Sequence, residues 1–247
     1  MNTNKSIIAV LPLAAFAGLA LAGTANAITL LSDDFSGSNG DNLHDTTPDV
    51  TTGGATWVAT ANYKADGSFT AQNVATMSLA FTPTNGFIYT LDAQIENLGG
   101  GHWAQFGFGG SQPTNSLWET RPWMLLRVDG STSSQHFVSP GSGTGTGGLV
   151  VWSNISTIDY SNDLDVRIVI DTTGGTDSWT ATWYAKAGNA GTYSEVGSEV
   201  TLTGVQDDIT SVGFSTYNAG DNFGKFNSFS LSDNTAIPEP TTTALLG

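Results

Sequence analysis

Apolar and polar residues alternate in short runs along most of the chain, and the clearest run covers residues 86–98. One parity of this run is apolar and the other is polar, as expected for a β-strand with one buried face. The apolar set is Phe87, Tyr89, Leu91, Ala93 and Ile95, and the polar set is Thr90, Asp92, Gln94 and Glu96. No amphipathic helical pattern occurs between residues 28 and 233. The sequence therefore predicts an all-β protein.

Further runs rich in β-branched or aromatic residues are separated by Gly, Asn, Asp and Pro, which favour turns. They cover residues 55–60, 73–83, 102–110, 123–130, 147–153, 164–175 and 178–188, and three more lie within 199–233. The segment DTTGGTDS at 171–178 predicts a hairpin, and the Gly-rich segment 139–148 predicts a loop. About 10–13 strands without crossover helices predict antiparallel pairing, and one apolar face per strand predicts a two-sheet sandwich.

Composition and charge narrow the class of protein. The chain has 247 residues, 39% of them hydrophobic, so it can bury a sizeable core, and seven Trp and twelve Phe argue against disorder. It has no cysteine, which excludes disulfides and thiolate metal sites. The formal net charge of −15 argues against nucleic acid and anionic membrane surfaces as partners, because their phosphates would meet like charge.

The first 27 residues have the layout of a secretory signal peptide. Lys5 precedes an apolar stretch from Ile7 to about Ala22, and the small-residue triplet ending in Ala27 follows. A transmembrane anchor is the alternative, but the stretch is short for one. We therefore expect cleavage by signal peptidase after Ala27 and a folded domain at 28–233.

The predicted domain begins with LLSDDFSGSNGDNLHDTTPDVTTGGATWVAT at 30–60 and ends with ITSVGFSTYNAGDNFGKFNSFSLS at 209–232. These two segments resemble the opening and closing strands of concanavalin-A-like (laminin-G-like) jelly rolls found in secreted bacterial proteins. The resemblance implies a lectin-like jelly roll whose first and last strands pair side by side. Pattern alone predicts only an antiparallel β-sandwich.

Candidate catalytic chemistry is sparse. Glycoside hydrolysis needs two carboxylates across the scissile bond. Asp92 and Glu96 share one face of the 86–98 strand, but they lack the Glu-x-Asp-x-x-Glu pattern that some jelly-roll glycosidases carry. None of His44, His102 and His136 lies in a recognised serine or cysteine nucleophile motif. We therefore expect no enzymatic activity, with a hydrolase using Asp92 and Glu96 as an alternative.

Two binding chemistries remain open. Acidic residues offer oxygen ligands to a structural Ca²⁺, although Asp and Asn also simply form turns; the candidates are Asp33, Asp34, Asp41, Asp45 and Asp221. No other cofactor is expected. Glycan binding needs aromatic faces with polar side chains nearby. If the apolar parity faces inward, the outward candidates are Trp103, Gln105, Trp123, Arg127 and Tyr184. Packing at the core or a sheet edge is the alternative for the tryptophans, because a one-residue shift in parity exchanges the faces.

The segment 234–247 is predicted to be a linker followed by an accessible extended tail, since each proline restricts the residue before it. Ile237, Pro238, Glu239 and Pro240, followed by TTTALLG, resemble the start of the PEP-CTERM sorting signal of Gram-negative bacteria. In that family an exosortase processes the signal and the protein reaches the cell surface or exopolysaccharide matrix. The membrane helix and basic cluster of the family do not follow here. We expect a truncated signal, with a degenerate signal as the alternative.

These observations lead to one expected function and two alternatives. We expect an exported, non-enzymatic surface or matrix protein, structural or adhesive, whose partners are signal peptidase and exosortase during export and extracellular polysaccharide afterwards. Its mature domain is not expected to be embedded in a membrane. A dedicated lectin-like carbohydrate-binding module is the first alternative, and the jelly-roll hydrolase is the second.

Overall fold

The computed structural model describes residues 27–69, 75–96, 103–110, 122–129, 133–135, 163–176, 178–187, 191–202, 209–217 and 224–235. All of them belong to one compact unit, Ala25–Ala236. Every regular element in these ranges is a β-strand, which confirms the all-β prediction. The described segments contain no helix long and apolar enough to cross a membrane. The described segments hold fourteen strands rather than about 10–13, because elements as short as two residues leave no alternation in a sequence.

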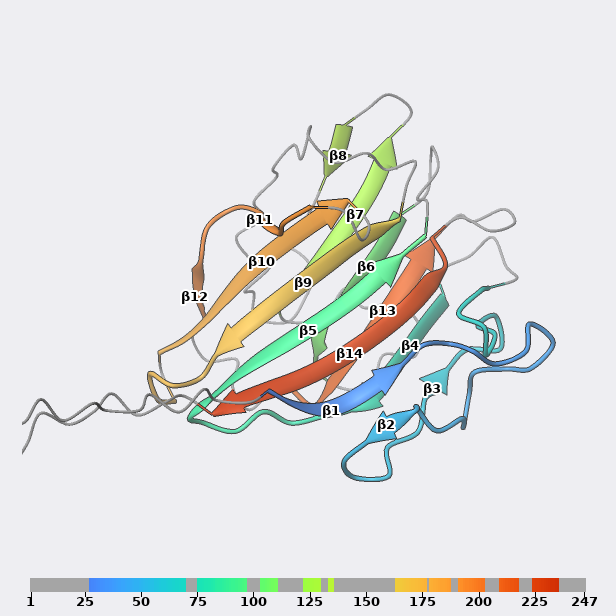
Figure 1. The fold of residues 1–247 in the computed structure, drawn as a ribbon, viewed down its shortest axis with the longest axis horizontal. Helices are drawn as coiled ribbons and strands as arrows, with labels where there is room; N and C mark the ends of the chain where they lie inside the picture. The colour runs from blue at the N-terminus through green and yellow to red at the C-terminus, as the bar shows by residue number, and fades with distance from the viewer. Residues whose placement is uncertain are drawn as a thin grey trace, which may run out of the picture. The chain divides into compact units, whose positions relative to one another are not determined.

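The strands form two antiparallel sheets, as predicted (Figure 1). The larger sheet has the order β11-β10-β9-β5-β14-β1-β2, with β12 also paired to β10. Its strands are β1 (Ile28–Asp33), β2 (Val50–Thr51), β5 (Phe87–Ile95), β9 (Leu164–Asp171), β10 (Trp179–Ala187), β11 (Ser194–Glu195), β12 (Val200–Leu202) and β14 (Phe226–Thr235).

The smaller sheet has the order β3-β4-β13-β6-β7-β8. Its strands are β3 (Val58–Ala59), β4 (Ala75–Ala80), β6 (Trp103–Gly109), β7 (Trp123–Asp129), β8 (Ser133–Gln135) and β13 (Ser211–Tyr217). Strands distant in sequence are neighbours in both sheets, as in jelly rolls and other sandwiches with long connections between strands.

The first and last strands pair side by side, as the jelly-roll resemblance implies (Figure 1). Ile28 lies opposite Asp233, and Leu31 lies opposite Leu231, with a register shift between them. Strand β14 also runs two residues further than expected, because Asn234 and Thr235 pair with β5. The linker expected from residue 234 therefore starts no earlier than Ala236.

The alternation along β5 separates core from surface as predicted. Tyr89, Leu91, Ala93 and Ile95 are each at most 3% exposed. The residues between them are partly exposed on the outer face of the larger sheet. The predicted hairpin is also present between β9 and β10: Gly175 has a φ of +87°, and Ser178 N–H donates to its carbonyl over 3.0 Å.

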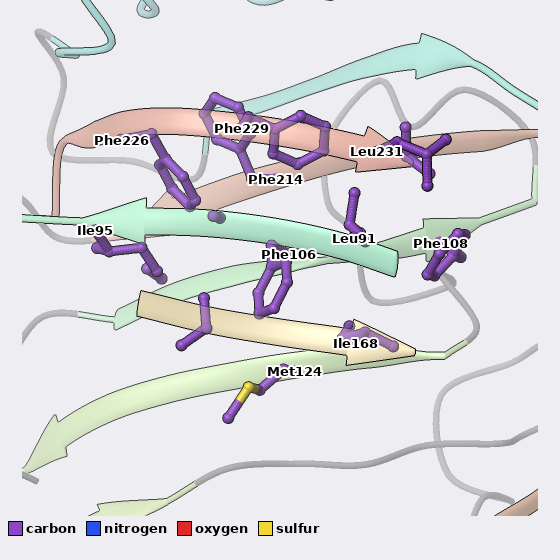
Figure 2. Packing of buried hydrophobic residues seen from close by; sticks show 14 of the residues in the cluster. Leu91, Ile95, Phe106, Phe108, Met124, Ile168, Phe214, Phe226, Phe229 and Leu231 are labelled. Carbon is purple, nitrogen blue, oxygen red and sulfur yellow. The ribbon is translucent and has the colours of Figure 1, made fainter. Parts of the chain in front are cut away.

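Aromatic rings join the two sheets in the core. Phe214 of β13 stacks on Phe226 of β14 with ring centroids 3.8 Å apart, and it meets Trp57 edge to face at 5.6 Å. Figure 2 shows these phenylalanines with Phe229. Around them lie Leu91, Ile95, Ile168 and Leu231 of the larger sheet and Phe106, Phe108 and Met124 of the smaller sheet. Burial of apolar surface, to which these large rings contribute strongly, is the main favourable contribution to folding.

Some sequence predictions lie outside the described residues, among them the strand expected at 147–153 and the loop expected at 139–148. The same holds for the signal segment up to residue 26 and for the tail from residue 236.

Candidate functional site

Three of the five predicted glycan-binding residues lie on the outer face of the smaller sheet. The core-facing side chains of β6 and β7 are Ala104, Phe106, Phe108, Met124 and Leu126. Strand alternation therefore places Trp103, Gln105 and Trp123 on the opposite face. The register sets Trp103 beside Arg127 and Gln105 beside Leu125. The side chain of Arg127 lies outside the described part of the structure.

These outward residues are nevertheless largely buried. Trp103 is 8% exposed, Trp123 5% and Gln105 0%. Trp103, Trp123 and Leu125 form an apolar cluster separate from the main core. A sandwich buries most of its apolar side chains between its two sheets, so this buried cluster on an outer face is additional to the packing that closes the sandwich.

A strip of small residues runs beside these tryptophans. One cross-strand row consists of Ser78, Gly213, Gly107 and Trp123. A Cβ on Gly107 would lie 2.6 Å from Trp123 Cα, so only glycine fits there. The buried hydroxyls of Ser78 and Ser211 have no hydrogen-bond partner in the described segments. We refer to Ser78, Ser211, Gly107, Gly213, Gln105, Trp103 and Trp123 as the outer-face cluster.

Sequence reasoning missed the small members of this cluster. Ser211 and Gly213 alternate with the core residues Val212 and Phe214 in the run SVGFS. That alternation was visible in the sequence. What it could not show is that β13 lies between β4 and β6, because that order depends on pairing between distant segments.

Tyr184 lies on the other sheet, so the five predicted residues do not form one site. Its neighbour Trp183 is fully buried in the core, and Tyr184 itself is partly exposed. It lies opposite Arg167 of β9 and Glu195 of β11 on the outer face of the larger sheet. Alternation within one strand shows whether a residue faces outward, but not which sheet the strand joins. Because the core separates the two outer faces of a sandwich, two outward residues can therefore lie on opposite sides of the domain.

Asp92, proposed as a catalytic carboxylate, is held in an ion pair on the larger sheet. Arg167 Nε donates to Asp92 Oδ1 over 2.7 Å, and Arg167 Nη2 donates to Oδ2 over 3.1 Å. Tyr193 O–H also donates to Asp92 Oδ1 over 3.2 Å, and its ring lies 4.2 Å from the Arg167 guanidinium carbon. Both carboxylate oxygens therefore accept hydrogen bonds from the chain itself, which leaves Asp92 poorly placed for acid–base work.

The protonation states of Tyr193 and Arg167 keep both of them as hydrogen-bond donors to Asp92. Burial raises the pKa of the Tyr193 hydroxyl, and the nearby charge of Asp92 raises it further, so the hydroxyl stays protonated and donates. Burial alone would lower the pKa of Arg167, but the hydrogen bonds and charge of Asp92 outweigh it and raise that pKa. Lys186 and Asp165 form a second ion pair at 3.1 Å, and Gln94 donates to Asp165 over 3.0 Å.

Replacing Arg167 by methionine should lower the free energy of unfolding by about 1–2 kcal/mol, because it leaves the half-buried Asp92 without its bidentate partner. Asp92→Asn should cost a similar amount, and the double variant should cost less than the sum of the two. Urea denaturation measures all three. Glu195→Gln, which changes an exposed carboxylate in the same cross-strand row, is the control and should shift stability by under about 0.5 kcal/mol. Strict additivity would contradict the pairing.

Two of the predicted calcium ligands come together, but with an unexpected partner. Carboxylate oxygens of Asp33, Asp34 and Asp49 lie within 4.8 Å of one another. Asp41 belongs to a separate turn, closed by its N–H to the carbonyl of Ser38, and Asp221 lies outside the described residues. Sequence reasoning did not include Asp49, because it lies fifteen residues beyond Asp34 in the turn before β2.

The carboxylates of this acidic cluster already serve the local fold. Trp57 Nε1 donates to Asp33 Oδ2 over 2.6 Å, Phe35 N–H donates to Asp33 Oδ1, and Asp34 N–H donates to Asp49 Oδ2. Burial raises the pKa of Asp33, as do the charges of Asp49 and Asp34, although the Trp57 hydrogen bond opposes them. The oxygens are suitable Ca²⁺ ligands in kind, and a bound ion stays a prediction.

No protein-family model matches the sequence, and no curated protein matches it. The structure is similar to the CBM2 module of Lactobacillus casei BL23 phage J-1 evolved Dit, with a TM-score of 0.50 and 9% identity over 86% of this chain and 98% of that one. It is also similar to arcelin-5, a lectin-like defense protein from Phaseolus vulgaris, with a TM-score of 0.46 and 10% identity over 86% of this chain and 100% of that one.

A xylan β-1,4-xylosidase from Bacillus halodurans C-125 also shares part of the fold. The TM-score is 0.44 and the identity 13%, over 81% of this chain and 38% of the xylosidase. At such identities these similarities extend to the lectin-like jelly-roll fold and to nothing further.

Proposed function

We propose that this chain is an exported, non-enzymatic jelly-roll module that binds extracellular glycan through the outer-face cluster. In this role it is a structural or adhesive component of a bacterial cell surface or exopolysaccharide matrix. The proposed localisation is supported by the likeness of residues 1–27 to a signal peptide and of Pro238, Glu239 and Pro240 to a sorting signal. The proposed localisation and the proposed glycan binding rest on different parts of the chain.

One observation carries the binding. Two tryptophans, a glutamine and two serines share the outer face of one sheet, away from the core that joins the sheets. The hydroxyls of the two serines, Ser78 and Ser211, have no hydrogen-bond partner in the described segments. Sugars offer apolar C–H faces for stacking on indole rings and hydroxyls for hydrogen bonds to Gln and Ser. Ser78, Gly213 and Gly107 lie in the same cross-strand row as Trp123, so the polar groups of the outer-face cluster are close to its indole ring.

The burial of both indoles adds a kinetic expectation. With exposures of 8% and 5%, their ring faces must be uncovered before a sugar stacks on them. Binding therefore includes a conformational step, and its association rate should fall below the usual range of about 10⁵–10⁷ M⁻¹s⁻¹.

A glycan array with the protein lacking residues 1–27 tests the proposal. We expect saturable binding of at least one extracellular polysaccharide, weakened about tenfold or more in Trp123→Ala and in Trp103→Ala, since losing one stacked aromatic costs at least about 1.4 kcal/mol. Because both side chains are buried, Trp123→Phe and Trp103→Phe are tested beside them, and thermal melting verifies folding. Tyr184→Ala removes an outward aromatic ring from the other sheet and should leave binding unchanged.

Two outcomes would contradict the proposal. Glycan binding that persists in folded variants of both tryptophans, or that Tyr184→Ala weakens equally, would remove the outer-face cluster as the site. Sugar release abolished by Glu96→Gln would favour the hydrolase alternative and overturn the non-enzymatic assignment.

A further inference from the structure

A separate open pocket lies at the edge of the sandwich, away from the outer-face cluster. Its volume is about 430 Å³, within the range of small-molecule sites. It lies where β1, β2 and the turn after β2 approach the end of β4, with β5 and β14 contributing one residue each. Its lining is Leu30, Leu31, Thr51, Thr52, Gly53, Ala55, Ala80, Phe81, Thr82, Tyr89 and Asp233.

The floor of this edge pocket is apolar and rigid. Leu31 and Tyr89 are 4% and 3% exposed. The Tyr89 hydroxyl accepts a hydrogen bond from Thr84 N–H over 2.9 Å, which fixes its ring. Phe81 packs on that ring edge to face, with centroids 5.3 Å apart. The two rings form an aromatic corner that a small apolar surface can contact without further ordering.

The polar groups of the pocket are three threonines and one carboxylate. Thr51 Oγ1 accepts a hydrogen bond from Ala55 N–H over 3.1 Å, so its own proton is free to donate into the pocket. Thr52 and Thr82 are exposed at the rim. Hydroxyls that both donate and accept suit a ligand that carries hydroxyls of its own.

Asp233 is the feature that most needs explanation. It lies opposite Tyr89, whose ring faces the core, so alternation places Asp233 on the inner face of the larger sheet. In the described part of the chain, its carboxylate makes no hydrogen bond or ion pair. Its carboxylate oxygens are therefore available to accept hydrogen bonds from the hydroxyls of a ligand in the pocket.

We propose that the edge pocket binds one neutral sugar unit, with Asp233 accepting hydrogen bonds from its hydroxyls and Phe81 contacting its C–H face. Asp233 is the sole charged residue of the lining, and the chain as a whole carries a formal charge of −15. Uronate, sulfate and phosphate groups are therefore disfavoured. The proposal stands independently of binding at the outer-face cluster.

Saturation-transfer NMR on the full chain tests it, with methyl β-D-glucopyranoside, methyl β-D-galactopyranoside and methyl α-D-mannopyranoside as neutral probes. We expect at least one of them to bind, and Asp233→Asn to weaken it about tenfold, the loss typical of hydrogen bonds to a charged group. Thr82→Val, nearly isosteric and at the rim, should weaken it to a smaller degree. The anionic probe methyl β-D-glucuronide should bind more weakly than methyl β-D-glucopyranoside. Asp233→Asn should reduce the difference between these two affinities.

Glu195→Gln is the control: it changes a carboxylate on β11 outside the pocket and should leave binding of the neutral probe unchanged. Trp123→Phe, in the outer-face cluster, is measured beside it to distinguish the two locations. If Trp123→Phe loses binding of the neutral probe while Asp233→Asn and Thr82→Val keep it, the sugar binds at the outer-face cluster. That result would overturn the edge-pocket proposal and support the proposed function. Absence of binding by all three neutral probes, binding insensitive to both Asp233→Asn and Thr82→Val, or binding of n-butylammonium in preference to the glycosides would also overturn it.

Discussion

Replacing Phe214 by alanine should lower the free energy of unfolding by about 3–5 kcal/mol, the usual cost of removing a buried phenylalanine ring. Phe214 is 0% exposed and lies on β13, at the centre of the contact between the sheets. Its ring contacts those of Phe35, Trp57, Tyr63, Phe226 and Phe229. Because these rings come from both sheets, the cavity would loosen the packing that holds the sandwich closed.

Urea denaturation followed by tryptophan fluorescence measures this loss, since Trp57 lies 5.6 Å from the Phe214 ring. Phe214→Leu keeps part of the volume and should cost less than the alanine variant. Val50→Ala, at a residue that is 41% exposed, should shift stability by under about 0.5 kcal/mol. A cost below about 1 kcal/mol for Phe214→Ala would mean that the rings do not pack as described.

Replacing Gly67 by alanine should destabilise the protein by about 2–4 kcal/mol, for two separate reasons. The backbone at Gly67 has a φ of +78°, which L-residues with a Cβ adopt at a cost of about 1 kcal/mol. An added Cβ would also overlap the carbonyl oxygen of Phe226. The loop cannot easily move aside, because Phe226 N–H donates to the Gly67 carbonyl and Gly67 N–H donates to the carbonyl of Lys64.

Two other glycines separate these contributions. Gly54 has a φ of +66°, and no atom lies within 4 Å of the position that an added Cβ would take, so Gly54→Ala should show only the conformational cost. Gly40 has neither feature, and Gly40→Ala should be nearly neutral. Thermal and urea denaturation should rank the losses as Gly67, then Gly54, then Gly40. Equal losses at Gly67 and Gly54 would show that the contact with β14 is not tight.

Local alternation predicted the faces of individual strands well. Along β5 the apolar parity is buried and the polar parity lies outside, and on β6 and β7 the parity of Trp103 and Trp123 is also as expected. The reason is that side chains of a strand alternate between its two faces whatever the strand pairs with. Burial of those tryptophans on an outer face did not follow from parity, since it depends on what covers the face.

Convergence of residues from different strands was beyond the reach of the pattern. Tyr184 had the right outward parity but lies on the other sheet, and Asp49 joins Asp33 and Asp34 only because β2 pairs with β1. The edge pocket combines residues from five strands or their ends, separated by up to about two hundred positions in the chain.

By itself, the sequence determined the all-β class, the two-sheet sandwich and the two faces of β5. These depend on side-chain periodicity and turn residues, which are local properties of the chain. The side-by-side pairing of the end strands was implied by the resemblance to jelly rolls. Tertiary structure alone decided that Asp92 is held by Arg167, that Tyr184 is separated from the tryptophans, and that Asp233 faces a pocket without a partner among the described residues. Each of these depends on the order and register of strands distant in sequence, which the packing of the whole core selects.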